Sequence, residues 1–285
     1  MSKLVVGIGE LLWDVFPTGK KLGGAPANFA YHVSRFGLDS LVVSAIGLDD
    51  LGEETVQALE EHDLRYHLDR LEEPTGTVQV TLDGNGVPQY EIKTGVAWDN
   101  IPYTKELAAI ASECQAVCFG SLAQRSPVSR ETIGWFLDAV PADCLKVFDI
   151  NLRQAFYSKG VLEDSLKRCD ILKINDEELV TVAGMFGYSG KDPEEICRPL
   201  MRDYNLKMVI LTCGTEGSHV FHEGGVSFLE TPKVEVVDTV GAGDSFTGAF
   251  VASILAGATV EEAHEKAVKV SAYVCTKSGA MPQMP

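Results

Sequence analysis

Residues 234–250, VEVVDTVGAGDSFTGAF, contain glycines, a carboxylate and an apolar run in an order that suits phosphate chemistry. The β-branched residues at the start of this stretch predict a strand, which residues 238–239 would break. Apolar residues at four-residue spacing after the glycines predict a helix: Phe246, Phe250 and Ile254. We therefore predict a strand, a tight turn and a helix.

The predicted turn at Gly241, Ala242 and Gly243 is suited to binding an anion. The first N–H groups of a helix have no partner inside the helix, and the helix dipole adds positive potential there. Glycine has no Cβ, so the backbone can approach a phosphate closely. We expect these three residues to bind a phosphoryl group through backbone amides.

Asp244 follows this turn and would lie in the first turn of the helix. A carboxylate beside a phosphate repels it, so chemistry is one reason for the placement. Asp244 could orient or deprotonate a hydroxyl that attacks phosphorus. Helix capping is the alternative, because Asp is common in a first helical turn. The rest of the chain has to decide between the two.

The composition indicates a globular α/β protein. The chain has 285 residues, 45% of them hydrophobic, which suffices for one large core with a small appendage. The net charge is −17 without a cluster of Lys or Arg, which argues against nucleic acid and membrane surfaces as partners. No apolar run reaches about 18 residues and the start does not resemble a signal peptide, so we expect a cytoplasmic protein. The seven scattered cysteines predict reduced thiols.

The elements around the turn are predicted to form a mostly parallel sheet covered on both faces, because strands and helices alternate after residue 101. The strand candidates are 116–119, 146–150, 170–174, 208–211 and 218–221, and the helix candidates are 127–140, 160–168, 175–186 and 193–204. Residues 65–100 differ, because TVQVTLD and VPQYEIK around a turn at residues 84–86 predict a hairpin. We expect a small β appendage there, which residues 11–16 could join.

Polar clusters follow three of the predicted strands. DINLR ends the strand at 146–150, NDEE follows 170–174, and TCGTEG follows 208–211. Ligands bind beyond the carboxyl ends of strands in such sheets, so these clusters predict one site. Each cluster also has a local explanation. For example, Asn175 and Glu178 would form a capping box.

Two familiar nucleotide-binding patterns are missing. Neither GK dipeptide has the GxxxxGK[ST] sequence, and Leu12 stands where a dinucleotide fingerprint needs its third glycine. A dinucleotide-dependent oxidoreductase therefore stays a remote alternative. The pattern favours a phosphate site built from backbone amides.

The chain resembles a known kinase family. GGAPANFAYHVSRFG and DTVGAGDSFTGAF resemble the two signatures of the ribokinase, or PfkB, family of carbohydrate and nucleoside kinases. DINLR, LKINDEEL, LTCGTEG and TKSGAMPQMP look like the sugar-kinase branch, fructokinases above all. The resemblance implies one ribokinase-like domain over residues 1–285, a three-layer α/β sandwich with a mostly parallel central sheet. It also implies a β lid formed from about 11–21 and 64–100.

The resemblance implies a role for each site residue. Asp244 would be the base, and the amides of Gly241, Ala242 and Gly243 would stabilise the transferring phosphoryl group. The positions that match the sugar site are Asp14, Gly23, Gly24, Asn28 and Arg153. Those that match the ATP site are Lys173, Asn175, Thr212, Gly214, Gly217, Gly279 and Ala280.

Two ions are implied as well. Glu178, with Asn175, would organise Mg²⁺ through water around the ATP phosphates. Asp238 and Val240, through their backbone oxygens, match a monovalent-cation site of many relatives, and whether this chain needs K⁺ stays open.

The implied function is an ATP-dependent sugar kinase that transfers the γ-phosphoryl group to a hydroxyl of a ketose, with fructose expected. The lid would exclude water, and lids of relatives often pair into homodimers. VAWDN around residues 95–99 departs from the fructokinase pattern, so other acceptors remain: 2-keto-3-deoxygluconate, ribose, or another small polyol or nucleoside. An acidic sugar should need an additional basic residue. An inactive sugar- or nucleotide-binding regulator is the non-enzymatic alternative.

Overall fold

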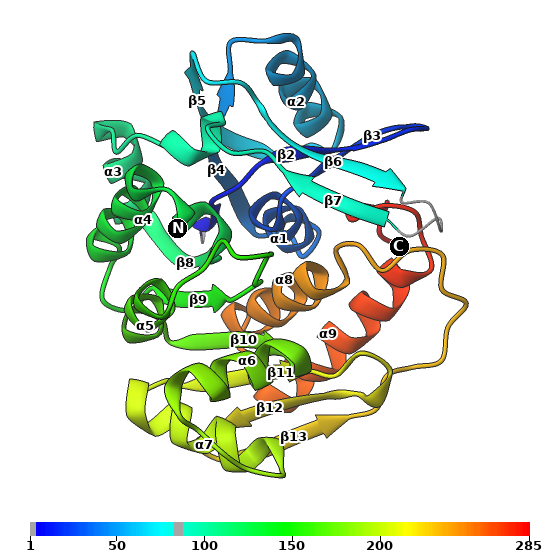
Figure 1. Cartoon of the computed structure of the whole chain (residues 1–285). Helices are drawn as coiled ribbons and strands as arrows, with labels where there is room; N and C mark the ends of the chain where they lie inside the picture. The colour runs from blue at the N-terminus through cyan, green and yellow to red at the C-terminus, as the bar shows by residue number, and fades with distance from the viewer. Residues whose placement is uncertain (1–3, 83–87) are drawn as a thin grey trace.

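The large sheet forms the middle layer of the molecule (Figure 1). The computed structural model describes residues 4–82 and 88–285, so the predicted turn at 84–86 lies outside the described residues. In spatial order the described strands of this sheet are β13 (Gly225–Leu229), β12 (Ser218–His222), β11 (Met208–Thr212), β10 (Ile171–Asn175), β9 (Leu145–Asp149), β8 (Cys114–Phe119), β1 (Leu4–Ile8), β4 (Asp39–Gly47) and β5 (Arg65–Leu71). All neighbouring pairs are parallel except those made by β12 with β11 and β13. The predicted parallel sheet is thus confirmed.

Helices cover both faces of this sheet, as its nearly continuous apolar strands require. One face packs against α1 (Ala25–Ser34), α2 (Asp50–Glu61), α8 (Ala242–Leu255) and α9 (Val260–Cys275). The other packs against α3 (Lys105–Glu113), α4 (Pro127–Ala139), α5 (Lys159–Arg168), α6 (Asp176–Phe186) and α7 (Pro193–Tyr204). This is the three-layer arrangement that the sequence predicts. In the described part of the chain, no helix is long and apolar enough to cross a membrane.

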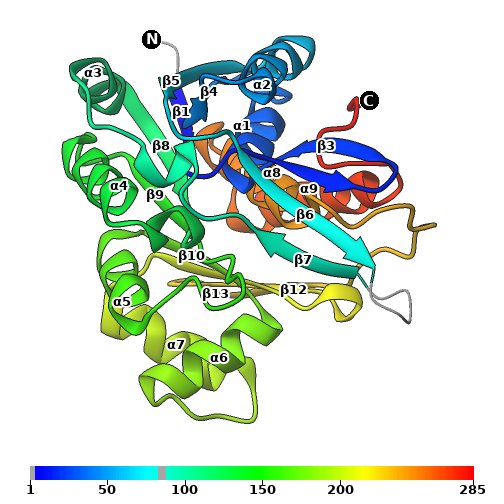
Figure 2. The ribbon, with the colours of Figure 1, turned by 45° about the horizontal axis from the view of Figure 1, so that its top comes forward.

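A second, small sheet projects from this body (Figure 2). Its strands, in spatial order, are β3 (Gly19–Gly23), β2 (Leu12–Phe16), β6 (Gly76–Leu82) and β7 (Pro88–Ile92). The hairpin and the recruitment of residues 11–16 agree with the sequence-based prediction. Residues 65–71 do not join it, because they form β5 and pair in parallel with β4 at the edge of the large sheet.

The predicted strand at residues 234–237 is wrong. These residues have no regular structure, and Val236 and Val237 are 59% and 63% exposed. A β-branched run forms a strand only where another strand can pair with it. Here the segment is a loop that leads from β13 to α8.

Residues 95–99, where the sequence departs from the expected pattern, anchor the small sheet to the body. The 3₁₀ helix at Ala97–Asn100 places Asp99 against Arg125, in the 3₁₀ helix at Leu122–Arg125, with Nε–Oδ1 at 2.8 Å. The Arg125 guanidinium also lies 3.9 Å from the centre of the Trp98 ring and donates a hydrogen bond to Lys93 O, just after β7. This buried ion pair therefore fixes where β7 leaves the body.

The helices α1 and α8 cross closely, which brings together residues more than 200 positions apart. A Cβ at Gly248 would lie 2.9 Å from His32 Cβ and 3.1 Å from Phe29 O. Similarly, a Cβ at Gly7 would lie 2.2 Å from Pro26 O, so α1 lies directly on β1. Glycines at these positions permit contacts that no other residue allows.

We predict that Gly248→Ala destabilises the protein by about 1–3 kcal/mol, because the added methyl group forces α1 and α8 apart. Chemical denaturation measures the change. Gly184→Ala is the matched control: Gly184 lies in α6 with no heavy atom within 4 Å of an added Cβ. There alanine should stabilise by up to about 1 kcal/mol through helix propensity. Equal unfolding free energies for the two variants would contradict the tight crossing.

Candidate active site

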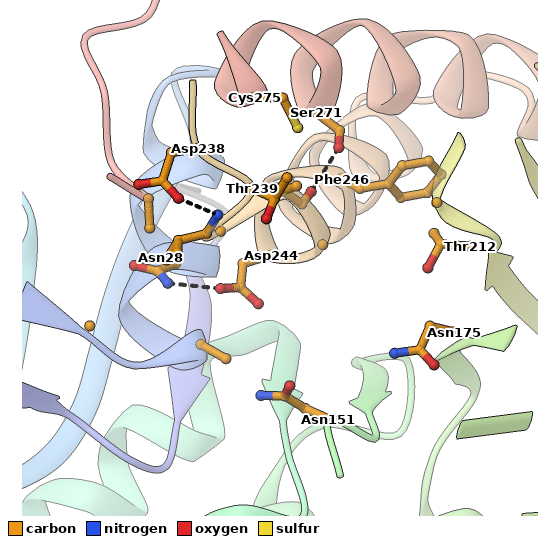
Figure 3. A pocket seen from close by; sticks show the side chains of 18 of the residues that line it. Asn28, Asn151, Asn175, Thr212, Asp238, Thr239, Asp244, Phe246, Ser271 and Cys275 are labelled. Atoms are coloured by element: carbon orange, nitrogen blue, oxygen red, sulfur yellow. Dashed lines mark hydrogen bonds between the residues drawn. The ribbon is translucent and has the colours of Figure 1, made fainter. Parts of the chain in front are cut away.

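All the site residues proposed from the sequence line one cavity of about 1420 Å³. The small sheet, the starts of α1 and α8, and the segments after β1, β9, β10 and β11 enclose it. Figure 3 shows Asn151, Asn175 and Thr212 facing Asn28 and Asp244 across this space. The polar clusters after the three strands therefore meet at one site, as expected. The residues before α8, where the sequence predicted a strand, complete it as a loop.

Asp244 forms a hydrogen bond with Asn28 at the start of α8 (Figure 3). Asn28 Nδ2 donates to Asp244 Oδ2 at 2.7 Å. Asn28 is 3% exposed, and its Oδ1 is buried without a hydrogen-bond partner in the described chain. Asp244 therefore does not cap the helix with its side chain. The pair presents one carboxylate oxygen and one amide oxygen for a ligand hydroxyl.

The surroundings raise the pKa of Asp244 to about 6. Burial is the main cause, and repulsion by Asp149 adds to it. The hydrogen bond from Asn28 and the positive charges of Lys173 and Arg153 oppose the rise. A carboxylate with such a pKa is ionised at neutral pH and is still basic enough to accept a proton from a polarised hydroxyl.

The turn before Asp244 has the predicted anion-binding form, with one difference. Gly241 adopts a φ of 76°, and a Cβ there would lie 2.5 Å from Ala280 Cβ. The Ala242 N–H donates a hydrogen bond to Thr239 O at 3.2 Å, which closes the turn, so this N–H is not free to bind an anion. In the described chain the N–H groups of Gly241, Gly243 and Asp244 donate to no protein group. These three amides are the ones available to an anion.

Lys173 brings a buried positive charge to this turn. Its Nζ lies 3.3 Å from Asp149 Oδ1, and Thr247 Oγ1 donates to Asp149 Oδ2 at 3.1 Å. A Cβ at Gly243 would lie 2.8 Å from Lys173 Nζ, so any other residue there would displace the ammonium from this position. Burial alone would lower the pKa of Lys173, but Asp149, Glu178 and Asp244 raise it. Lys173 is therefore a permanent cation under the turn.

Glu178 and Asn175 form the capping box that the sequence suggested and also line the cavity. Glu178 Oε2 accepts the Asn175 N–H at 2.9 Å, and Oε1 accepts the Leu152 N–H at 2.8 Å. These bonds fix the carboxylate while leaving lone pairs for a metal-bound water. In the described part of the chain, no group of three or more Asp, Glu, His or Cys side chains is placed so that it could hold a metal ion by itself. The residues thus fit a Mg²⁺ held mainly by phosphates and water.

The residues predicted to bind the sugar lie where the small sheet meets α1. Asp14 is in β2, and a Cβ at Gly23 would lie 2.8 Å from its Oδ2, so the glycine makes room for the carboxylate. Gly24, with a φ of 123°, is the N-cap residue that precedes α1. Burial raises the pKa of Asp14, against the pull of Arg153 and Lys21. Arg153 forms no ion pair within the described residues, and its charge reaches Asp14 and Asp244.

The residues predicted to bind ATP come from the loop after β11 and the segment after α9. Thr212 ends β11, Gly214 begins the 3₁₀ helix at Gly214–Glu216, and Gly217 has a φ of 120°. Gly279 and Ala280 approach the turn from the other side, where Ala280 O forms a hydrogen bond with His32 Nε2 at 2.8 Å. Asp238 and Val240 lie in the loop between these groups.

Two residues of the site, Glu10 and Lys21, were not singled out from the sequence, and Asp149 was named only as part of the DINLR cluster. Glu10 follows β1, is 2% exposed and has an unpartnered Oε2, and burial raises its pKa to about 7. Glu10 could have been found, because its carboxylate follows a buried strand. Lys21 gives no such signal, since only the folded chain brings it to the loop before α8.

Comparison with known proteins gives the family. The model of the pfkB family of carbohydrate kinases matches residues 7–285. An ATP-dependent 6-phosphofructokinase of Thermoanaerobacterium thermosaccharolyticum is 28% identical over 99% of this chain and 90% of its own length. Fructokinase-2 of Solanum lycopersicum is 27% identical over 100% of this chain and 94% of its own.

A solved structure shows the same fold. A double-mutant fructokinase of Vibrio cholerae, with fructose, ADP and a potassium ion bound, superposes with a TM-score of 0.80. It is 23% identical, and the match covers 99% of this chain and 94% of the other. The fold is therefore the ribokinase-like α/β fold with a small separate sheet.

We predict that Asp244→Asn stabilises the protein by about 1–3 kcal/mol at pH 8, because it removes a carboxylate whose charge is disfavoured by burial. The pKa of Asp244 rises from 3.8 to about 6 on folding, so the native protein binds the extra proton between these values. The gain should therefore be complete above the folded value and shrink as pH falls, until it vanishes near pH 4. Denaturant unfolding at several pH values measures it. A gain that does not change with pH would contradict the raised pKa.

Proposed function

The chain belongs to the pfkB family of carbohydrate kinases, and from this premise we propose that it transfers the γ-phosphoryl group of ATP to a hydroxyl of a ketose, with fructose the first candidate. Membership of this family makes the protein a phosphotransferase. It argues against the two alternatives considered from the sequence, a dinucleotide-dependent oxidoreductase and an inactive binding regulator. The observation that carries the proposal is the Asp244 carboxylate, which faces the cavity beside Asn28 and next to the free amides of the turn. A base and a phosphoryl-binding group thus lie side by side.

The acceptor hydroxyl is bound and deprotonated by side chains on the sugar side. Asp14 and the unpartnered Asn28 Oδ1 accept hydrogen bonds from sugar hydroxyls, which places one hydroxyl at Asp244. Asp244 takes the proton of that hydroxyl as its oxygen attacks phosphorus. The Asn28 hydrogen bond keeps the carboxylate in place during the transfer.

Charge that develops on the phosphoryl group meets fixed donors. The N–H groups of Gly241, Gly243 and Asp244 and the Lys173 ammonium face the same region, so little reorganisation is needed. Glu178 and Asn175 would hold water bound to Mg²⁺, which neutralises phosphate charge. Apolar residues of the small sheet that line the cavity, Val78 and Ile92 among them, exclude water and so limit ATP hydrolysis. Pairing of two small sheets in a homodimer stays a prediction.

The choice of sugar rests on relatives and on one side chain. Several curated relatives are named fructokinases, which favours fructose. Arg153 favours a second candidate, an acidic sugar such as 2-keto-3-deoxygluconate or the sugar phosphate in the name of the phosphofructokinase relative. The guanidinium has no carboxylate partner among the described residues and can bind an anionic group in bidentate fashion.

We predict that Asp244→Asn lowers kcat by about 10²–10⁴-fold, the contribution of a general base, with little change in ADP or sugar affinity. In the unmodified enzyme kcat/KM should fall below pH 6, because protonated Asp244 cannot accept the hydroxyl proton. A coupled assay of ADP release measures both quantities. Asp14→Asn is the contrast, since losing a charged acceptor should raise the sugar KM about 10- to 100-fold and leave kcat nearly unchanged. Full activity of Asp244→Asn would exclude Asp244 as the base.

A sugar panel with the Arg153→Met variant separates the two acceptor classes. For fructose we expect turnover by the unmodified enzyme and a change in KM of less than about threefold in the variant, because no ionic contact is lost. For 2-keto-3-deoxygluconate or fructose 6-phosphate as the true acceptor, the variant should raise KM by about 10- to 100-fold. No turnover with any ketose, pentose, acidic sugar, sugar phosphate or nucleoside would refute the proposed activity.

A further inference from the structure

His32, in α1, is a buried side chain that the proposed mechanism does not use. Its Nε2 lies 2.8 Å from Ala280 O, and it is not among the described residues that line the cavity. A carbonyl oxygen can only accept a hydrogen bond, so Nε2 carries the proton and donates it to Ala280 O. Burial lowers the pKa of His32 to about 4, so the ring is neutral at neutral pH. His32 is therefore an uncharged hydrogen-bond donor in a fixed place.

The hydrogen bond of His32 belongs to one face of α1, which contacts both the proposed base and the segment after α9. Asn28, Tyr31 and His32 stand at positions i, i+3 and i+4, so their side chains lie on the same side of the helix. Asn28 donates to Asp244, and the Tyr31 hydroxyl donates to Pro282 O at 2.6 Å. Helix α1 therefore connects the proposed base with the segment that is predicted to bind ATP.

The His32 side chain lies between α8 and this segment. A Cβ at Gly248, in α8, would lie 2.9 Å from His32 Cβ. At the other end of the side chain, Ala280 packs against the phosphate-facing turn, because a Cβ at Gly241 would lie 2.5 Å from Ala280 Cβ and 3.1 Å from Ala280 O. Loss of the hydrogen bond from His32 would free Ala280 to move away from Gly241. The Gly241 N–H is one of the amides available to an anion.

The loop before α8 holds the start of the segment independently of α1. Asp238 Oδ2 accepts the Gly279 N–H at 3.0 Å and lies 3.4 Å from Lys21 Nζ. The same ammonium donates a hydrogen bond to Ser278 Oγ at 3.0 Å. These contacts remain when the hydrogen bond from α1 is removed. We therefore expect a local shift of Ala280 and not the loss of the whole segment.

We propose that His32, together with Tyr31, positions the nucleotide site: their hydrogen bonds keep the segment after α9 against the phosphate-facing turn and thereby set the affinity for nucleotide. The inference rests on the proposed kinase function, because the nucleotide is the ATP or ADP of that reaction. Both residues act through the backbone of the segment, at Ala280 O and Pro282 O. They are positioning residues and not ligands of the nucleotide.

The test compares variants that lose a buried donor to a backbone oxygen. His32→Leu replaces the ring with an apolar side chain that cannot donate. His32→Gln is the conservative variant, because the amide nitrogen of glutamine can donate to Ala280 O. Ser40→Ala is the matched control: Ser40, in β4, donates to Ala30 O of α1 at 2.8 Å and does not line the cavity. Isothermal titration calorimetry measures Mg²⁺–ADP affinity, and thermal unfolding without nucleotide measures stability.

We expect His32→Leu to bind Mg²⁺–ADP about 5- to 50-fold more weakly than the unmodified protein, and His32→Gln to recover the affinity to within about threefold. Ser40→Ala should lower the unfolding temperature, as His32→Leu does, and bind ADP normally. Tyr31→Phe is a milder second test, because it keeps the ring and removes only the hydroxyl that donates to Pro282 O. It should weaken ADP binding by about 2- to 10-fold, and it decides the question if His32→Leu does not fold.

Three results would overturn the inference and leave the proposed kinase function intact. One is normal ADP affinity in folded His32→Leu, or in Tyr31→Phe if His32→Leu does not fold. Another is a His32→Gln variant that binds as weakly as His32→Leu, because the hydrogen bond would then not be the cause. The third is an equal loss of affinity in Ser40→Ala, which would trace the effect to a general loosening of α1. Absence of ADP binding by the unmodified protein would instead refute the proposed function, and the inference with it.

Discussion

The negative charge of Asp244 is the constraint on which the rest of the site depends. A carboxylate that acts as a base for an incoming hydroxyl must lie beside an anionic phosphoryl group, so it repels the ligand that it serves. The protein raises its pKa to about 6 by burial and by the neighbouring charge of Asp149. It then limits the rise with the hydrogen bond from Asn28 and the ammonium of Lys173. The same lysine faces the turn, so one cation lies beside both the proposed base and the proposed phosphate position.

Close backbone packing makes this arrangement possible. Asn28 and Asp244 come from opposite ends of the chain and meet only because α1 and α8 cross without a side chain between them at Gly248. Gly243 likewise permits a close approach, because a Cβ there would collide with the ammonium of Lys173. The family signatures are therefore largely packing requirements, which explains why glycines accompany the polar residues in both. A substitution at such a glycine would move the chemistry as well as the core.

Most of the fold and the phosphate side of the site could be predicted from the sequence, because both depend on local patterns. The alternation of strand and helix patterns predicted the large sheet, and the glycines before Asp244 predicted the turn. The incorrect or missed predictions concern strands and side chains whose partners are distant in the sequence, which a local pattern does not reveal. Residues 234–237 have strand-like composition but no strand beside them, and residues 65–71 pair with β4 and not with the hairpin. Lys21 was missed for the same reason, since its partner lies 217 residues away.

The charges around the cavity explain why the sugar is harder to infer than the reaction. In a chain of net charge −17, several cations near the site are balanced by named carboxylates: Lys173 by Asp149 and Lys21 by Asp238. Such pairs fix the shape of the phosphate side and leave little charge for a variable ligand. Arg153 differs, because its charge reaches Asp14 and Asp244 without an ion pair in the described chain. Arg153 lies on the proposed sugar side, so we expect its charge to bear on which acceptor binds, whereas Lys173 on the proposed phosphate side is already paired with Asp149.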